Sequence, residues 1–198
     1  MITACFARAL QRCAGRLYMG FVFIFQAVRL VDKTRNQLIG YSGHKHQKGE
    51  KLIAITENQG YVLAPVPVAP VNETDTVLFP EGLQALKKVA KEVGVDLKGA
   101  YLNLDGGFDS AHNRKCIFNA GLIPNIKENP RNRKTTKRGR KRLFNEAVHA
   151  LRMRVERTFA WEDKFKRLLL RFERIQRRRY GMKLLAYTLI NLRKFCGT

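Results

Sequence analysis

The order of apolar segments along this chain of 198 residues predicts an α/β fold in which a sheet is followed by a layer of helices. Short apolar runs bounded by turn residues, typical of buried strands, alternate with segments in which apolar residues recur at helical spacing. After about residue 143 the strand-like runs cease and the helical pattern continues toward the C-terminus. The chain therefore combines a sheet, flanking helices and a helical C-terminal layer.

The first strands are expected in the N-terminal half. Gly20–Phe25 is apolar but too short to cross a membrane, which predicts a buried strand. Lys51–Thr56 and Tyr61–Val66 form a predicted β-hairpin around the turn Asn58–Gly60. The prolines that follow end the second strand of this hairpin, because proline cannot donate to a sheet.

Helices and strands are expected to alternate from residue 80 onward. Apolar residues at helical spacing predict a helix over Pro80–Val93, with the proline in its first turn and Gly94 as its C-terminal stop. The next expected elements are a buried strand over Gly99–Leu104, a helix over Asp109–Gly121 capped by Asp109 or Ser110, and a short strand over Ile123–Ile126.

Residues 127–142 form a predicted basic loop, and helices follow it. The first of these helices is expected to begin near Leu143, the second to lie around residues 164–174, and the last to span Met182–Phe195. Apolar side chains at helical spacing on the last helix predict packing against another helix, in part at a homodimer contact. These side chains are Leu185, Leu189, Leu192 and Phe195.

The charge of the chain predicts a polyanionic partner. Its 38 basic and 16 acidic residues give a formal net charge of +22, and nucleic acid is the commonest partner of such an excess. The hydrophobic fraction of 45% is that of a globular protein. No apolar run is long enough to span a bilayer, and the four cysteines lack metal-binding spacing, so we expect no membrane partner and a reducing, cytoplasmic location.

Two acidic positions on different elements suggest metal chemistry. Asp105 ends a predicted buried strand, where open α/β sheets place ligands. His149, Arg152, Glu156 and Asp163 fall on one face of a predicted helix. If the carboxylates of Asp105 and Glu156 meet, they could hold Mg²⁺ or Mn²⁺, which prefer oxygen ligands. The alternative for Glu156 is an ion pair with Arg152 within the helix.

Four motifs give the chain a family resemblance. They are Ile39–Lys45, Leu104–Ser110, Ile126–Asn129 and Arg152–Trp161. From about residue 40 to residue 195 the sequence resembles the catalytic region of bacterial insertion-sequence transposases of the DDE class. The last motif resembles their Y-x2-R-x3-E-x6-K signature: Arg152 and Glu156 match, His149 stands at the Tyr position, and Asp163 stands at the Lys position with Lys164 next to it.

This resemblance implies an RNase H-like fold and an active site of three carboxylates that binds Mg²⁺ (or Mn²⁺). Asp105 corresponds to the second carboxylate and Glu156 to the third, both as metal ligands, and Arg152 would orient Glu156 and offset its charge. The implied reaction is attack of metal-activated water on a phosphodiester at a transposon end. The freed 3′-hydroxyl would then attack target DNA.

The first carboxylate of the set is not evident. No Asp or Glu precedes Asp32, which lies in a polar, turn-like stretch. We therefore divide the chain into an atypical N-terminal segment, residues 1–31, and a catalytic domain, residues 32–198, whose first catalytic strand is missing or altered. Three interpretations remain: a truncated or frameshifted remnant, one half of an enzyme whose other half comes from an upstream reading frame, or a rearranged site that uses Asp32.

These observations predict a transposase whose catalysis is impaired; the alternatives are a non-catalytic DNA-binding remnant and, more remotely, an RNA-binding protein. Double-stranded DNA, as transposon ends and target, is the expected partner, and a nucleoid-associated location in a bacterium follows. Lys and Arg contacts to phosphates give affinity without sequence readout. The residues expected to make them are Arg131, Arg133, Lys134, Lys137, Arg138, Arg140 and Lys164.

Overall fold

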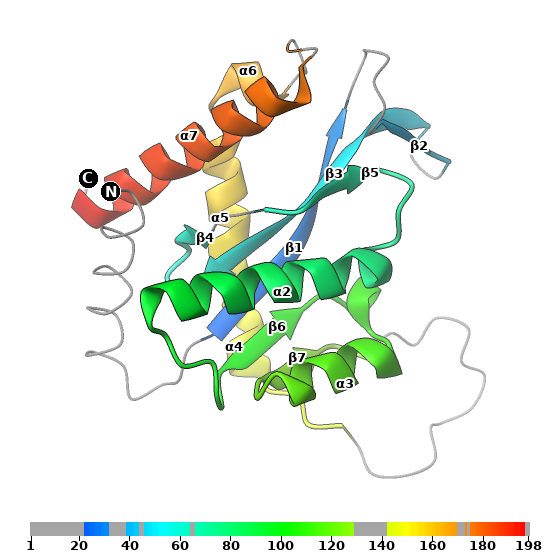
Figure 1. Ribbon diagram of the computed structural model, residues 1–198, viewed down its shortest axis with the longest axis vertical. Coiled ribbons are helices and arrows are strands. Elements are labelled where there is room, and N and C mark those ends of the chain that lie inside the picture. Colours follow the sequence, from blue (N-terminus) through cyan, green and yellow to red (C-terminus); the bar gives the residue numbers. More distant parts are fainter. Residues whose placement is uncertain are drawn as a thin grey trace.

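A computed structural model describes residues 22–31, 39–43, 46–63, 66–128, 142–169, 173 and 175–196 (Figure 1). Its centre is β1 (Val22–Val31), which runs antiparallel to β3 (Gln47–Glu57) and parallel to β6 (Tyr101–Leu104). The next strand, β7 (Ile123–Ile126), lies parallel to β6. The strand order along the sheet is therefore β2-β3-β1-β6-β7.

Three short strands pair with β3 along its other edge. They are β2 (Gly40–Ser42), β4 (Val62–Leu63) and β5 (Val68–Pro70), all antiparallel to β3. The predicted hairpin is confirmed, because β4 returns along β3 after the turn at Asn58–Gly60. The strand expected over Gly20–Phe25 is also present, but it extends to Val31. The boundary that we placed after residue 31 therefore follows a strand that belongs to the middle of the sheet.

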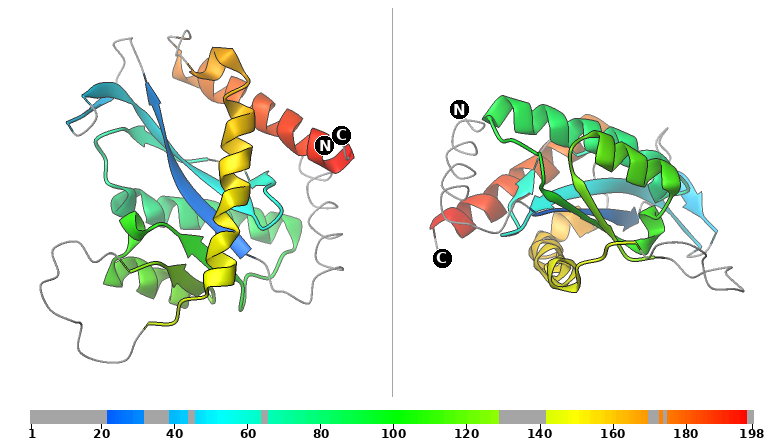
Figure 2. Two further views of the ribbon diagram at one scale, coloured as in Figure 1. Left: turned by 180° about the vertical axis from the view of Figure 1, so that it is seen from behind. Right: turned by 90° about the horizontal axis from the view of Figure 1, so that it is seen from below.

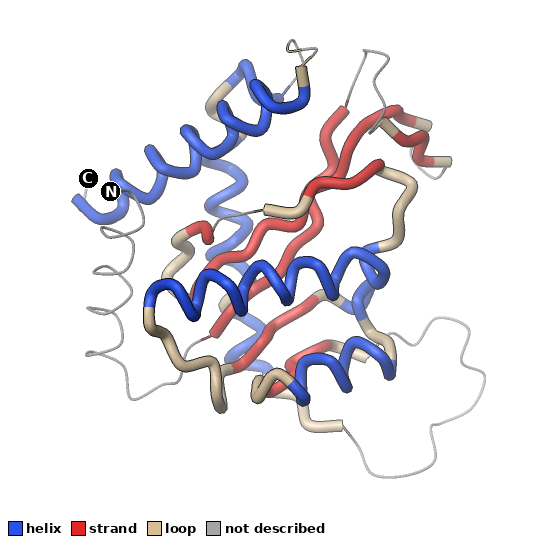
Figure 3. The backbone as a smooth tube through the Cα atoms, in the orientation of Figure 1, coloured by secondary structure: helices blue, strands red, loops and turns tan. Residues whose placement is uncertain are grey.

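Helices cover both faces of the sheet (Figures 2 and 3). On one face lie α2 (Asp75–Val93) and α3 (Ala111–Asn119), whose apolar side chains join one core cluster with Ile53 and Ile55 of β3. On the other face lie α5 (Arg152–Glu162) and α7 (Gln176–Cys196). Leu52 and Ala54 belong to the cluster on this second side, as the alternation of a strand requires. The α/β class with a helical C-terminal layer is thus confirmed.

The start of α2 differs from the predicted one, and a tertiary contact accounts for the difference. The helix α2 begins at Asp75, five residues before Pro80, and the proline lies inside it. Pro80 has no N–H to donate to the carbonyl of Thr76, and the side-chain amide of Asn113 approaches that carbonyl at 3.5 Å instead. Ser110, one of the two predicted caps of α3, accepts from the N–H of Asn113 at 3.0 Å, so this helix begins at Ala111 and not at Asp109. The predicted stop at Gly94 is confirmed, with φ +69°.

The C-terminal helices are broken where the sequence suggested longer segments. α4 (Glu146–Ala150) and α5 are separated at Leu151, and α6 (Lys166–Leu169) is a single turn. α7 begins six residues before the expected start at Met182. None of the described helices combines the length and hydropathy that crossing a membrane requires.

The expectation that a leucine stripe on α7 packs against a helix is wrong within this chain, whereas the homodimer contact stays a prediction. Its members, Leu185, Leu189, Leu192 and Phe195, are 46–60% exposed. The face of α7 that packs on the sheet is formed instead by Lys183, Ala186, Tyr187 and Ile190. These residues also recur at three- and four-residue spacing, and the sequence alone does not say which of the two stripes is buried.

Candidate active site

Asp105 directly follows the C-terminal end of β6. It caps a short 3₁₀ turn, η1 (Gly106–Phe108), by accepting from the N–H of Gly106 at 2.7 Å. The preceding Leu104 and the following Phe108 are buried, so the backbone on both sides of Asp105 is fixed. The side chain itself is 60% exposed and can receive a ligand from solvent. The sequence placed Asp105 at this strand end, as the structure does.

A network of buried asparagines attaches α4 to the ends of β6 and β7. The side-chain amide of Asn103 donates to the carbonyl of Val148 at 3.1 Å. Asn125 accepts from the N–H of Asn145 at 2.8 Å and donates to the carbonyl of the same residue at 3.1 Å. Asn125 also donates to the Oδ1 of Asn103 at 3.3 Å. Because α5 continues from α4, these bonds set the position of α5 relative to Asp105.

The α5 helix brings Arg152 to Asp105. Arg152 Nη1 lies 3.2 Å from the Oδ1 of Asp105, and Val155 packs against Ile24 of β1 with both side chains fully buried. Glu156 is exposed and lies one turn after Arg152, on the same side of the helix. Arg152 thus forms an ion pair with Asp105, and its predicted role of orienting Glu156 stays a prediction. That the Asp105 and Glu156 carboxylates share one ion stays a prediction.

His149, at the position where the resemblance expects tyrosine, faces the same network. Its Nδ1 lies 3.2 Å from the Oδ1 of Asn103, and its ring lies against that of Phe144 with 5.0 Å between centroids. Burial lowers the pKa of His149, and the nearby cations Arg152 and Lys127 lower it further. A neutral ring that donates from Nδ1 suits the carbonyl oxygen of Asn103. His149 therefore serves to hold α4 in place.

The first carboxylate is absent from β1. The sequence of this strand, VFIFQAVRLV, contains neither Asp nor Glu. In the parallel pairing of β1 with β6, Ile24 is opposite Asn103. Continuing this register by two residues puts Gln26 at the level of Asp105. Asp32, the acid considered as a substitute, lies outside the described residues.

The acids that the structure describes do not form a complete metal site. In this part of the chain, no group of three or more His, Cys, Asp or Glu side chains is placed to hold an ion. Asp105 and Glu156 suit a single divalent ion in chemical type. The arrangement that binds two ions needs further oxygen ligands, and these residues do not fit it.

The basic loop is closed at its base by ion pairs. Arg142, at its end, lies 3.5 Å from Glu128 and 2.9 Å from Asp109. The side chain of Asp109 is only 7% exposed and also pairs with Arg114 of α3 at 2.8 Å. The six loop residues predicted to contact DNA, Arg131, Arg133, Lys134, Lys137, Arg138 and Arg140, lie outside the described residues. Lys164, the seventh, is exposed, and its Nζ lies 3.7 Å from the centre of the Trp161 ring.

Sequence reasoning missed two groups of residues. The asparagines of the network could have been noticed, because Asn103 interrupts an apolar strand between two leucines, and a buried polar side chain implies partners. The second group is a set of cations that gathers where α5, α7 and the β3–β4 turn meet: Arg154, Arg157, Arg193 and Lys194. No pattern in the sequence joins them, since two lie nearly forty residues after the others.

Comparison with known proteins agrees with this architecture. The family model described as Transposase DDE domain matches residues 25–189. Among solved structures, the cryo-EM structure of a piggyBac transposase synaptic complex with hairpin DNA is similar with a TM-score of 0.54 and 13% sequence identity. The similarity covers 87% of this chain and 46% of that chain, so this chain spans less than half its length.

No curated protein matches the sequence significantly. The structural similarity, at its low identity, shows a shared fold. The family match covers most of the chain and includes β1 from Phe25 onward, Asp105 and Glu156. This chain belongs to the family of DDE transposase domains.

Proposed function

We propose that this chain binds DNA as a transposase domain of RNase H-like fold, and that its strand-cutting reaction is impaired by the loss of one carboxylate. The fold proposal is supported by the strand arrangement. Antiparallel strands lie on one side of β1 and parallel strands on the other, with helices on both faces. Asp105 follows the strand beside β1, and Glu156 lies on a helix that packs on β1.

The observation that carries this proposal is the composition of β1. This strand holds the central position in the sheet, beside the strand that leads to Asp105, yet it bears no acid. Residue 26, at the level of Asp105, is glutamine, which is a neutral and much weaker ligand for a divalent cation than a carboxylate. An intact strand without its acid favours an altered site over a site whose first strand is missing.

Asp105 and Glu156 would hold one Mg²⁺ or Mn²⁺ ion. A bound ion of this kind supplies positive charge next to a phosphodiester. The side chain of Arg152, which contacts Asp105, supplies positive charge at the same place and offsets one carboxylate. Two carboxylates provide too few oxygens to hold two ions at the ~3.5–4 Å separation of a two-metal site. Electrostatic stabilisation is usually the largest catalytic contribution, so we expect cleavage near background.

Double-stranded DNA, as transposon ends and target, is the proposed partner. The net charge of +22 and the basic loop support this proposal. The ion pairs of Arg142 hold the two ends of that loop together, which suits a loop presented to a phosphate backbone. Action next to the bacterial nucleoid would follow. The second candidate is a non-catalytic DNA-binding remnant, which the lack of an acid in β1 also favours. It differs from the first candidate only in having no residual metal-dependent activity.

The test is a strand-cleavage assay on DNA that carries the element's ends, in Mg²⁺ and in Mn²⁺, with binding measured in parallel. We expect the chain to bind duplex DNA and not to cut it. Asp32→Asn and Glu156→Gln variants serve as comparisons. Cleavage that is lost in Glu156→Gln but survives in Asp32→Asn would show that two carboxylates suffice, and the proposal of impairment would be wrong. Cleavage lost in both would make Asp32 the missing ligand.

A further inference from the structure

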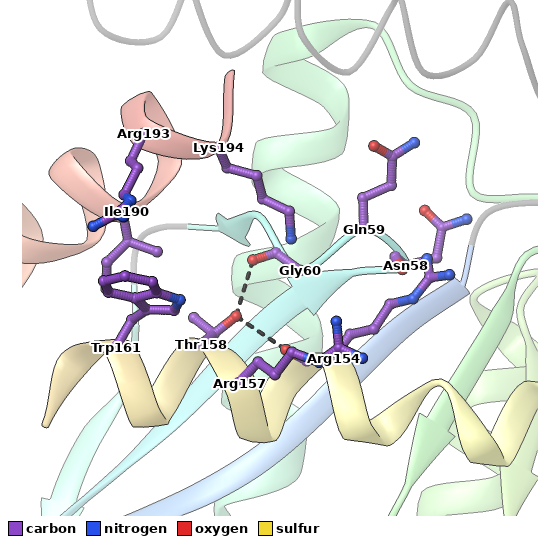
Figure 4. Close-up of a pocket in the computed structure, with 10 residues that line it drawn as sticks. All are labelled: Asn58, Gln59, Gly60, Arg154, Arg157, Thr158, Trp161, Ile190, Arg193 and Lys194. Carbon is purple, nitrogen blue, oxygen red and sulfur yellow. Dashed lines mark hydrogen bonds between the residues drawn. The ribbon is translucent and has the colours of Figure 1, made fainter. Parts of the chain in front are cut away.

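A pocket of about 690 Å³ opens between α5, α7 and the turn that joins β3 to β4 (Figure 4). Its lining combines backbone and side chains of the turn with cations and one indole from the two helices. The residues are Asn58, Gln59, Gly60, Arg154, Arg157, Thr158, Trp161, Ile190, Arg193 and Lys194. No Asp or Glu is among them.

The walls of this pocket are fixed by hydrogen bonds. Arg154 donates to the carbonyl of Asn58, and the hydroxyl of Thr158 donates to that of Gly60 at 3.1 Å. Asn191 of α7 accepts from the N–H of Val62 at 2.9 Å and donates to its carbonyl at 3.0 Å. Gly60 has φ +88°, and a Cβ atom there would lie 2.8 Å from the Nζ of Lys194. The turn and both helices therefore form one preorganised site.

The residues that line the pocket carry positive charge that no acidic residue in the lining balances. Within the described residues, no ion pair joins Arg154, Arg157 or Lys194 to a carboxylate. Glu57, the acid whose charge acts on Lys194, is buried, and its Oε1 accepts from the N–H groups of Gln59 and Tyr61. Burial lowers the pKa of Lys194, and Arg154 and Arg157 lower it further against the opposing effect of Glu57. An anion in the pocket would relieve this crowding.

Trp161 holds cations in place and is not a free stacking surface. Its ring lies between Lys164, at 3.7 Å, and Arg193, at 4.0 Å from the centroid. It also packs on the cluster that contains Tyr187 and Ile190. A base could stack on this indole only by displacing one of the two cations. The chemistry of the pocket therefore suits phosphate groups, and its indole offers no free face to a base.

We propose that this pocket binds the phosphodiester backbone of DNA, as a contact separate from both the Asp105–Glu156 site and the basic loop. At 100° per residue, Arg154 and Trp161 project from the side of α5 opposite to Arg152 and Glu156, and Arg157 lies about 100° around the helix from Glu156. The bound phosphates are thus not those at the acids. DNA as the source of the phosphates rests on the proposed function; a free polyphosphate would offer the same chemistry.

The test compares two double variants that remove equal charge. Arg157→Gln with Lys194→Gln removes two pocket cations, and Lys87→Gln with Lys88→Gln removes two exposed cations from α2, on the other face of the sheet. Duplex DNA binding is measured by fluorescence anisotropy across a series of salt concentrations. We expect the log–log salt slope to become shallower by about 1–2 in the pocket variant, at about 0.9 for each phosphate that the variant no longer neutralises. The slope of the α2 variant should change by less than about 0.5.

The remaining outcomes separate this inference from its alternatives. Equal slopes in the two double variants would overturn the proposal, because the effect would then be one of net charge. Tripolyphosphate, titrated into the chain without DNA, provides a second arm. Binding of tripolyphosphate to a chain that binds no duplex would assign the pocket to a free phosphate compound and overturn the DNA assignment. Matching circular dichroism spectra of the variants and the wild type would exclude misfolding. The test measures binding only, so it remains valid if the chain does not cleave DNA.

Discussion

Replacing Gln26 by Asp would return a carboxylate to the central strand at the level of Asp105. The placement rests on the pairing of Ile24 with Asn103, extended by two residues along both strands. Strand residues two apart share a face, and Ile24 packs against Val155 of α5. We therefore expect an Asp introduced at residue 26 to lie on the face of the sheet that α5 covers. Gln26→Asp should complete a set of three acids on β1, β6 and α5.

The size of the effect without metal follows from the strand spacing. Adjacent strands lie about 4.8 Å apart, so an Asp at residue 26 and Asp105 would place two negative charges at roughly 5 Å. Their repulsion is about 1 kcal/mol in water and about 3 kcal/mol at the effective dielectric of a protein surface. Asp105 is 60% exposed, which favours the lower part of this range. For a chain of this length the melting temperature should fall by about 3–9 °C.

Divalent metal should reverse this loss. An ion that binds the folded chain at a hundred times its dissociation constant adds about 2.7 kcal/mol of stability. The assay is thermal unfolding in EDTA and in saturating Mn²⁺ or Mg²⁺. Gln26→Asn is the control without added charge, and Gln26→Asp combined with Glu156→Gln removes a partner. Gln26→Asp alone should gain several degrees more from the metal than either of the other two variants.

A metal response no larger in Gln26→Asp than in Gln26→Asn would refute this reasoning. It would mean that residue 26 does not face Asp105, and that the missing acid belongs elsewhere. If the metal response survives Glu156→Gln, the ion would bind to the strands alone, and Glu156 would lose its assigned role. Because the measurement is of stability, neither conclusion depends on restored DNA cleavage.

Two further predictions concern buried groups around the site. Asn103→Ala should destabilise the fold by about 2–4 kcal/mol in denaturant unfolding, because the carbonyl of Val148 and the side chain of Asn125 lose their buried partner. The control, Asn119→Ala on the exposed end of α3, should have little effect. Equal losses of stability in the two variants would exclude the asparagine network as the anchor of α4. Burial raises the pKa of Glu57 above its ordinary 4.5, so the folded state binds the proton of this carboxyl more tightly than the unfolded state does. The stability that this proton contributes is therefore lost as pH rises from 4.5 through the raised pKa of the folded state. Glu57→Gln should therefore gain stability relative to the wild type as pH rises above 4.5, and a constant difference across pH would contradict the assignment.

The strands and turns were the most predictable part of the fold, because their signals are local. The turn at Asn58–Gly60 and the stop at Gly94 depend on residues adjacent in sequence, and both lie where expected. The start of α2 was not predictable, because Pro80 inside the helix is tolerated with help from Asn113, thirty-three positions away. Likewise, which stripe of α7 is buried depends on the sheet beneath it.

The residues of the candidate site also fall into two groups: those that local sequence patterns indicated, and those that only the folded chain brings together. Asp105 was found because it ends an apolar strand, and Arg152 and Glu156 because they follow a spacing that one helix can display. The ion pair of Arg152 with Asp105 joins residues 47 positions apart, and no local pattern indicates it. The basic pocket is the extreme case. Its cations become a site only when the chain folds α7 onto α5 and both onto the β3–β4 turn.

Arg152 contacts an oxygen of Asp105 that a metal ion would need. The arginine could therefore limit metal binding in place of the missing acid. The ion pair is exposed on its Asp105 side and has a separation of 3.2 Å. Pairs of this kind contribute about 0–1 kcal/mol, and salt weakens them further. A divalent ion or a DNA phosphate can therefore displace Arg152 at small cost. By contrast, β1 contains no acid that could replace a lost carboxylate ligand. On the proposed function, the composition of this strand, and not the arginine, limits what the site can do.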